Sequence, residues 1–173
     1  MRIGLVSDTH GLFDAELVRL FQGCELILHA GDVTQQRVLD ALGRIAPVRG
    51  VRGNNDLGPF ADLLPETTVV RLGELSAFMI HELGHPEKPV AAARRSLARA
   101  RSEIVVFGHT HQPLATVQGG ILYVNPGAAG PRRFKLPRTA GILEVQGRRA
   151  AVALHELAEA GTRPFGQPLD VAL

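Results

Sequence analysis

Cysteine is almost absent from this chain, and aromatic residues and long apolar runs are scarce. The 173 residues contain one cysteine, Cys24, and no tryptophan, and aromatic side chains make up 5% of the composition. A single thiol excludes an intramolecular disulfide and a zinc site built from several thiolates. No apolar run approaches the ~18 residues of a membrane-spanning helix. The formal net charge of +2 does not require a nucleic-acid partner. We therefore expect a globular protein in the cytoplasm.

Three short apolar segments near the start of the chain each lead into polar residues. They cover residues 3–6, 26–28 and 48–52. The first is too short for a signal peptide, so we interpret it as a strand. Helical apolar stripes follow the first two, with expected caps at Asp14 and Thr34. Alternating strands and helices predict an α/β fold, which binds ligands where its strands end, and Asp8, His10 and Asp32 lie at such ends.

The second half of the chain predicts mainly strands. Paired β-rich runs around glycine turns indicate hairpins, and a segment rich in alanine and arginine indicates one helix. The expected hairpins are 67–72 with 75–80, 114–118 with 121–124, and 140–145 with 150–155, and the expected helix is 89–101. The segment 158–173 contains two glycines and two prolines. We predict one domain over residues 1–157 and an irregular C-terminal tail over 158–173.

A further buried strand, residues 104–107, ends in the motif Gly-His-Thr-His at 108–111. If the backbone stays extended there, both imidazoles point the same way, as two ligands of one metal would. Taken alone, the motif more often marks two partly exposed loop histidines than a metal site. Residues 53–56, Gly-Asn-Asn-Asp, similarly fit a simple turn. His29 is expected to pack in the interior rather than to bind an ion directly.

Metal-ligand types nevertheless recur at five predicted strand ends. The residues are Asp8, His10, Asp32, Asn54, His81, His109 and His111. Oxygen and nitrogen donors without sulfur suit manganese, iron, cobalt, nickel or zinc better than calcium or magnesium, which prefer oxygen alone. Because seven donors are too many for one such ion, we predict two ions that share a carboxylate.

The ordered motifs Asp-x-His, Gly-Asp, Gly-Asn-x-Asp, His and Gly-His-x-His resemble those of the calcineurin-like metallophosphoesterase superfamily. The short chain, with Asn-Pro-Gly after the last motif, is similar to the small bacterial and archaeal phosphodiesterases over residues 2–155. The resemblance implies a four-layer α/β/β/α sandwich with a dinuclear metal site. It implies that Asp8, His10, Asp32 and His111 hold one metal, that Asn54, His81 and His109 hold the other, and that Asp32 bridges them.

The resemblance also implies a reaction, hydrolysis of a phosphate diester by a hydroxide that bridges two divalent ions. Manganese is the first choice of metal, with iron, nickel, cobalt or zinc as alternatives. Asp32, Asn54 and His109 are the ligands that we expect to take part in catalysis. Many relatives that cleave monoesters carry a histidine where this chain has Asn55, which cannot act as a general acid. A small phosphodiester is therefore the expected substrate.

Other interpretations remain open. Relatives commonly have His-Gly or His-Gly-His where residues 81–85 read His-Glu-Leu-Gly-His, so Glu82 or His85 could alter the mouth of the site. A basic loop contains Arg132, Arg133, Lys135 and Arg138, which either contact a phosphate or are simply solvated. The retromer scaffold subunit resembles the same fold, so a weakly catalytic or non-catalytic protein-binding scaffold is one alternative. A nuclease is another, which the modest charge disfavours. The resemblance is also compatible with a homodimer.

Overall fold

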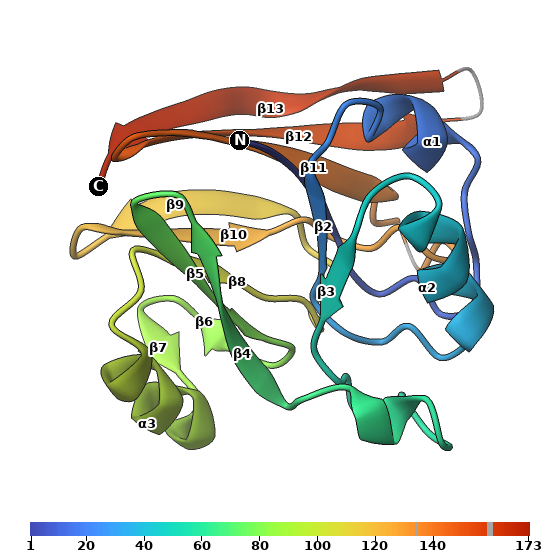
Figure 1. Ribbon diagram of the computed structural model, residues 1–173, viewed down its shortest axis with the longest axis horizontal. Coiled ribbons are helices and arrows are strands. Elements are labelled where there is room, and N and C mark those ends of the chain that lie inside the picture. Colours follow the sequence, from blue (N-terminus) through green and yellow to red (C-terminus); the bar gives the residue numbers. More distant parts are fainter. Residues whose placement is uncertain (134, 159–160) are drawn as a thin grey trace.

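The computed structural model of the protein describes residues 1–133, 135–158 and 161–173. Within these ranges, two β-sheets stack face to face and helices cover their outer sides (Figure 1). The first sheet is six-stranded, in the order β13-β12-β11-β1-β2-β3. Its strands are β1 (Arg2–Val6), β2 (Leu26–His29), β3 (Val48–Gly50), β11 (Thr139–Gln146), β12 (Arg149–Ala158) and β13 (Gly161–Ala172). Because β1, β2 and β3 run parallel, their carboxyl ends lie at the same edge of the sheet.

The second sheet is five-stranded among the described residues, in the order β4-β5-β8-β10-β9. Its strands are β4 (Thr67–Leu72), β5 (Leu75–Ile80), β8 (Ile104–Val106), β9 (Leu114–Gln118) and β10 (Ile121–Asn125). The three predicted hairpins are present, as β4–β5, β9–β10 and β11–β12. A short hairpin of β6 (Gly84–His85) and β7 (Lys88–Pro89) follows β5. Its sequence gave no sign of pairing.

Alternating strand residues create the four layers. In β1, Ile3 and Leu5 point into the core between the sheets, whereas Val6 points to the outer side that α1 and α2 cover. In β8, Ile104 faces the same inter-sheet core and Val105 packs under α3. The helices are α1 (Glu16–Leu20), α2 (Gln36–Gly43) and α3 (Ala91–Ala100), with a 3-10 turn η1 (Ala61–Leu63). The predicted α/β/β/α sandwich is therefore confirmed.

The C-terminal segment is a strand, so the prediction of an irregular tail is wrong. β13 pairs antiparallel with β12, and Phe165 and Leu169 pack against the inter-sheet core. Pro164 and Pro168 are tolerated because β13 is the edge strand, where a missing N–H need not break a sheet hydrogen bond. Residues 159 and 160 of the predicted tail lie outside the described residues.

The helix starts also differ from the sequence prediction. Thr34 does not cap α2; its φ is +62°, and α2 begins after Gln35, which makes no capping side-chain hydrogen bond. The cap position of α1 is Ala15 and not the predicted Asp14, although Asp14 Oδ1 accepts the backbone N–H of Glu16, the first residue of α1, at 2.8 Å. In the described part of the chain, no helix has the length and hydrophobicity needed to cross a membrane.

Candidate metal centre

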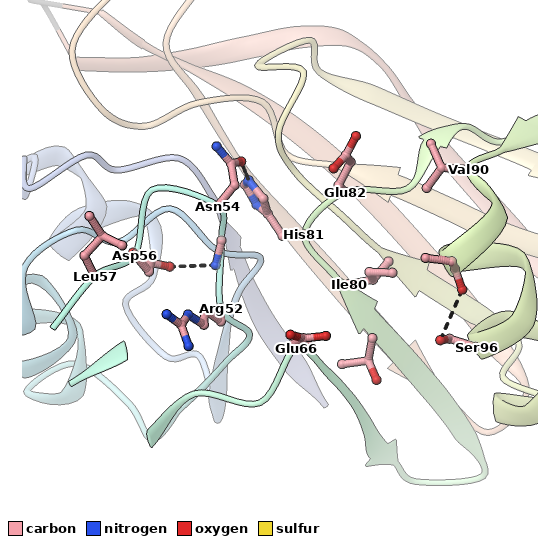
Figure 2. A pocket seen from close by; sticks show the side chains of 13 residues that line it. Arg52, Asn54, Asp56, Leu57, Glu66, Ile80, His81, Glu82, Val90 and Ser96 are labelled. Atoms are coloured by element: carbon pink, nitrogen blue, oxygen red, sulfur yellow. Dashed lines mark hydrogen bonds between the residues drawn. The ribbon is translucent and has the colours of Figure 1, made fainter. Parts of the chain in front are cut away.

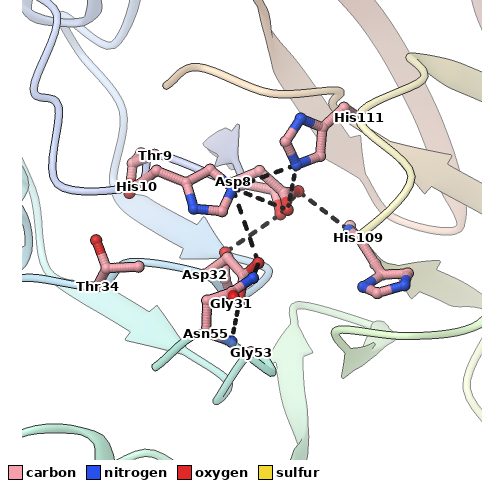
Figure 3. A network of polar contacts seen from close by, with 12 residues as sticks. Asp8, Thr9, His10, Gly31, Asp32, Thr34, Gly53, Asn55, His109 and His111 are labelled. Atoms are coloured by element: carbon pink, nitrogen blue, oxygen red, sulfur yellow. Dashed lines mark hydrogen bonds and ion pairs between the residues drawn. The ribbon is translucent and has the colours of Figure 1, made fainter. Parts of the chain in front are cut away.

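The loops that follow β1, β2, β3, β5 and β8 converge, and they bring all seven predicted ligands together. Figure 3 shows part of this cluster, in which Asp8, His10 and His111 lie on one side of Asp32. Asp8, Asp32 and His81 also form a group whose ligand atoms lie within 4.8 Å of one another. The short contacts divide the cluster into two halves that share Asp32.

The first half contains Asp8, His10 and His111, and it is largely buried. His111 Nε2 lies 3.2 Å from Asp8 Oδ1 and 3.2 Å from His10 Nε2. His10 Nε2 is 4.0 Å from the same Asp8 oxygen. The other oxygen of Asp8 accepts hydrogen bonds from the Ser7 hydroxyl at 2.6 Å and the His109 backbone N–H at 3.1 Å. These bonds fix the carboxylate and leave Oδ1 aimed at the two imidazoles.

The second half contains Asn54, His81 and His109, and it is more open. Asn54 Oδ1 lies 3.1 Å from His81 Nε2 and 2.9 Å from His109 Nδ1. The two rings meet edge to face, with centroids 5.2 Å apart. The other ring nitrogen of His81, Nδ1, lies 2.7 Å from the backbone oxygen of Ala30, which orients the imidazole toward Asn54.

Asp32 stands between the halves. Its Oδ2 is 3.8 Å from His10 Nε2 and 3.5 Å from His81 Nε2. Asn55 holds both carboxylate oxygens, since its backbone N–H donates to Oδ1 at 2.8 Å and its side-chain amide donates to Oδ2 at 2.6 Å. Burial by itself raises the pKa of Asp32, but the hydrogen bonds from His81 and Asn55 outweigh this effect and lower it. The carboxylate is therefore charged at neutral pH.

The electrostatics of the centre favour a positive charge. Burial lowers the pKa of His81, yet the contact with Asp32 and the charge of Asp8 more than compensate and raise it. Burial and then the charge of Arg133 lower the pKa of His10, so that its imidazole is neutral and able to act as a ligand. Two buried carboxylates thus attract a cation, and the neutral imidazole of His10 lies beside both of them.

One buried atom gives a direct test of whether metal fits. Within the described residues, Asp8 Oδ1 is the single buried side-chain oxygen or nitrogen without a hydrogen-bond partner. A carboxylate oxygen buried without a partner is costly, and coordination to a cation removes that cost. Asp8, His10 and His111 also offer three ligand atoms within 4.8 Å of one another. The donor set and its geometry fit a transition-metal ion.

An extended backbone was considered for the motif at 108–111. The backbone at the centre is not extended. Asp8, His10, Asp32, His109 and His111 all have φ between 45° and 70°, the left-handed region that residues other than glycine rarely adopt. As a result, His109 and His111 do not share one neighbour. His109 contacts the second half and His111 the first. Such strain, of order 1–3 kcal/mol per residue, concentrates at functional sites.

Two residues that sequence reasoning did not single out support these loops. The buried carboxylate of Asp56 accepts backbone N–H groups of Asp32, Thr34 and Gly53, at 3.0, 2.6 and 2.7 Å. It ties the loop after β3 to the loop after β2. Asn125 donates from Nδ2 to the Gly108 carbonyl at 2.9 Å and to Thr110 Oγ1 at 3.0 Å. The Gly-Asn-x-Asp and Asn-Pro-Gly motifs carried the signal for both, but residue type alone did not reveal their roles.

Glycine is required at two places beside the ligands. A Cβ atom on Gly53 would collide with the backbone and carboxylate of Asp32. A Cβ atom on Gly108 would collide with the Ser7 hydroxyl and lie 2.8 Å from Asp8 Oδ2. Any other residue would push the two carboxylates out of position.

Comparison with known proteins identifies the family. The model of the calcineurin-like phosphoesterase superfamily domain matches residues 1–148. The chain belongs to this superfamily. Among its relatives, a probable metallophosphoesterase from Methanothermobacter thermautotrophicus is 32% identical over 162 residues, covering 86% of this chain and 88% of the relative. The phosphodiesterase YfcE of Escherichia coli is 29% identical over 167 residues, covering 83% of this chain and 88% of YfcE.

Solved structures show the same fold. Vacuolar protein sorting 29 from Cryptosporidium parvum superimposes with a TM-score of 0.82 at 20% identity, covering 99% of this phosphoesterase chain and 98% of the other. Vps29 of Entamoeba histolytica, solved in complex with Zn²⁺, gives a TM-score of 0.78 at 21% identity, covering 98% and 99% of the two chains. At these identities the likeness concerns the fold.

The remaining predicted residues of this phosphoesterase take different positions. His29 is fully buried, as expected, with Nδ1 accepting the Gly31 N–H at 3.2 Å and Nε2 lying 3.0 Å from Thr9 Oγ1. Glu82 reaches the mouth of the site, where its Oε1 is 3.9 Å from His109 Nε2. His85 instead belongs to the short β6–β7 hairpin and is exposed.

The basic loop is only partly free. Arg138 forms an ion pair with Asp14 at 2.6 Å and donates to the carbonyls of Ala129 and Gly130 at 2.8 and 2.7 Å, so its role is structural. Arg132 and Lys135 are exposed. Arg133 is exposed as well, and it influences the pKa of His10 from the first half.

Proposed function

We propose that this protein is a metal-dependent phosphodiesterase whose seven converging residues hold two divalent ions. The observation that carries the proposal is the position of Asp32 Oδ2, 3.8 Å from His10 Nε2 and 3.5 Å from His81 Nε2, with a separate set of donors on each side. One carboxylate between two donor sets is the arrangement that two ions sharing a ligand need. Asp8, His10 and His111 would complete one site, and Asn54, His81 and His109 the other.

The charges of the chain suit an anionic ester. Two divalent ions carry four positive charges, and Asp8 and Asp32 offset two of them, so the loaded centre attracts a phosphate group. When bound, such ions supply a water of lowered pKa and neutralise charge that develops on the phosphoryl oxygens. The reaction forms a P–OH bond and breaks one P–OR bond, which releases an alcohol and a phosphate monoester.

The environment of Asn55 supports a diester rather than a monoester. Its side-chain amide donates to Asp32 Oδ2 at 2.6 Å, and its backbone N–H donates to Asp32 Oδ1 at 2.8 Å, so the residue is committed to this carboxylate. An amide cannot deliver a proton to a poor leaving group. Diesters with good leaving groups, which depart without such help, are therefore the substrates that this centre suits. We expect manganese to be the most effective metal, with iron, nickel, cobalt and zinc to be compared.

Metal-stripped protein provides the test. We expect it to bind two Mn²⁺ per chain by titration calorimetry and then to hydrolyse bis-p-nitrophenyl phosphate. Asp32→Ala should lose both properties, whereas Asp40→Ala, a matched change on the exposed face of α2, should lose neither. Folded protein that shows no turnover with Mn, Ni, Co or Zn would overturn the proposal.

A protein-binding scaffold is the second candidate, favoured by the structural likeness to Vps29. A scaffold needs no complete ligand set, whereas each of the seven positions here holds a residue able to coordinate a metal. Metal binding without turnover would favour the scaffold. Size-exclusion chromatography with light scattering would show in the same preparation whether the chain is a monomer or a homodimer.

A further inference from the structure

A cleft of about 410 Å³ opens directly beside the second half of the metal centre (Figure 2). Its walls come from the loop after β3, the start of β4, the end of β5 and the start of α3. Asn54 and His81 belong both to the candidate centre and to the wall of the cleft. A phosphate held at the centre would therefore lie next to this cleft.

The size and lining of the cleft suit a small organic group. Its volume lies in the range of pockets that bind small molecules. Leu57, Ile80 and Val90 contribute apolar surface, and Ser96 offers a hydroxyl on α3. Such a surface favours an alcohol with an apolar body and few polar atoms. An inorganic phosphate would leave most of it unused.

The charged side chains on the wall of the cleft favour some ester groups over others. Glu66 and Glu82 lie on its wall, and Glu66 forms no ion pair among the described residues. Arg52 is the basic group on this wall, but its Nη1 lies 3.5 Å from Asp62 Oδ1, so part of its charge is already offset. Glu82 also stands at the boundary with the metal centre, 3.9 Å from His109. A second anionic group entering the cleft would meet two carboxylates.

We propose that this cleft binds one ester group of the substrate, and that it selects an uncharged or cationic group over an anionic one. The proposal rests on the phosphodiesterase activity proposed above. It narrows the substrate class to diesters of a small neutral or cationic alcohol, and it disfavours substrates that carry a second phosphate or a carboxylate. Glu66 is the residue that determines this specificity.

Three p-nitrophenyl phosphodiesters of matched length provide the test. Their second ester groups are 2-methoxyethyl, 2-(trimethylammonio)ethyl and 2-carboxyethyl, which are neutral, cationic and anionic. With the manganese-loaded protein, we expect kcat/KM for the carboxyethyl ester to be about tenfold below that of the other two, the scale of one charge interaction at a partly exposed site. Glu66→Lys should reverse the order of the charged pair, mainly through KM.

Two controls separate charge and size from indirect effects. Glu74→Lys makes the same change of charge at the opposite end of the β4–β5 hairpin and should leave the order unchanged. Val90→Trp should fill the cleft and raise KM for the methoxyethyl ester, but not for methyl p-nitrophenyl phosphate, whose methyl group needs no cleft. Both sites are exposed, so the variants should fold.

The outcomes distinguish the two proposals. If all three esters are hydrolysed with equal kcat/KM and Glu66→Lys changes them equally, the cleft does not select by charge and this inference is wrong, while the phosphodiesterase activity stands. If none is hydrolysed with any metal, the activity itself fails and the inference with it.

Discussion

The two halves of the candidate metal centre differ in depth. In the first half, the side chains of Asp8, His10 and His111 are 0%, 10% and 8% exposed. In the second half, His81 is 4% exposed, but His109 is 38% exposed and Asn54 lies at the surface beside the cleft. The buried half contains the oxygen without a partner, and the open half faces the place where an ester group would bind. The difference suggests a division of labour, with a permanent ion in the first half and an exchangeable, substrate-facing ion in the second.

We expect the largest effect from a substitution that disables the buried half. Asp8→Asn removes one charge and keeps the shape of the side chain. We expect kcat/KM for bis-p-nitrophenyl phosphate to fall by about 10⁴-fold, because the loss of one ion removes several kcal/mol of transition-state stabilisation. Metal analysis after dialysis should give at most one tightly bound ion. Two retained ions would contradict the assignment of Asp8, and Asp40→Asn serves as the matched control.

Disabling the open half should have a smaller effect. Asn54→Ala removes the oxygen that lies between His81 and His109, but it leaves the buried half intact. We expect kcat/KM to fall by about 10³-fold, while one tightly bound ion remains. Raising the concentration of Mn²⁺ should recover part of the activity, since the remaining donors bind weakly. Asn55→Ala tests the neighbouring amide, and it should instead disturb the orientation of Asp32.

A fall in pH should lower the stability of the protein through His29, whose ring contacts Thr9 in the loop that carries Asp8 and His10. Burial lowers the pKa of His29 to about 4, and its Nδ1 already accepts an N–H from Gly31, which a protonated ring could not do. Between about pH 4 and 6.5 the unfolded chain therefore binds more protons at this residue than the folded chain does. Stability is lost as the pH falls through this window, by up to about 3 kcal/mol from His29.

Urea denaturation of the metal-free protein at pH 7, 6, 5 and 4 measures this loss. In His29→Gln the free energy of unfolding should fall less between pH 7 and pH 4, by that amount, even if the variant is less stable at pH 7. His85→Gln, which removes an exposed histidine, should retain the slope of the original protein. Equal slopes for all three proteins would show that the neutral His29 is not a source of acid sensitivity.

The smallest effect is expected at Asn125, which supports a ligand in each half. Asn125 secures the loop that carries both His109 and His111 through two hydrogen bonds from Nδ2. Asn125→Ala should lower the free energy of unfolding by about 1–3 kcal/mol, since buried acceptors lose their donor. The substitution should also weaken the binding of both ions by about tenfold. Gln112→Ala, an exposed change in the same loop, is the control, and an effect confined to one half would contradict this account.

Residue type and order were enough to predict an α/β chain with three hairpins and the convergence of the seven ligand-type side chains, whereas the four layers followed from the resemblance to the superfamily. Short apolar runs that end in Asp, Asn or His predict where strands stop and which side chains gather there. Backbone conformation could not be predicted in the same way. The left-handed φ angles of His109 and His111 arise because the surrounding loops impose them, and sequence spacing suggested an extended chain instead.

The loop propensity of glycine and proline also gave a wrong prediction for the C-terminal segment. Gly161, Pro164, Gly166 and Pro168 are typical of loops, yet they lie in β13, because Phe165 and Leu169 gain more from packing on the core than the prolines cost at a sheet edge. The role of Asp56 was hidden for a different reason. Its hydrogen bonds go to backbone N–H groups, which every residue has, so no partner residue marks them in the sequence.

The pairing of β1 with β11 has a consequence for the synthesis of the protein. Ser7 and Asp8 accept backbone hydrogen bonds from Ala129 and Gly130, at 3.0 and 3.1 Å, and Leu5 pairs with Gly141. A ribosome that adds 5–20 residues per second needs roughly ten seconds to make the segment between them. Until then, β1 has β2 beside it but lacks β11, and for most of that time the chain also lacks His111. The buried half therefore cannot form on the nascent chain, and any ion it takes up must arrive after most of the polypeptide has emerged.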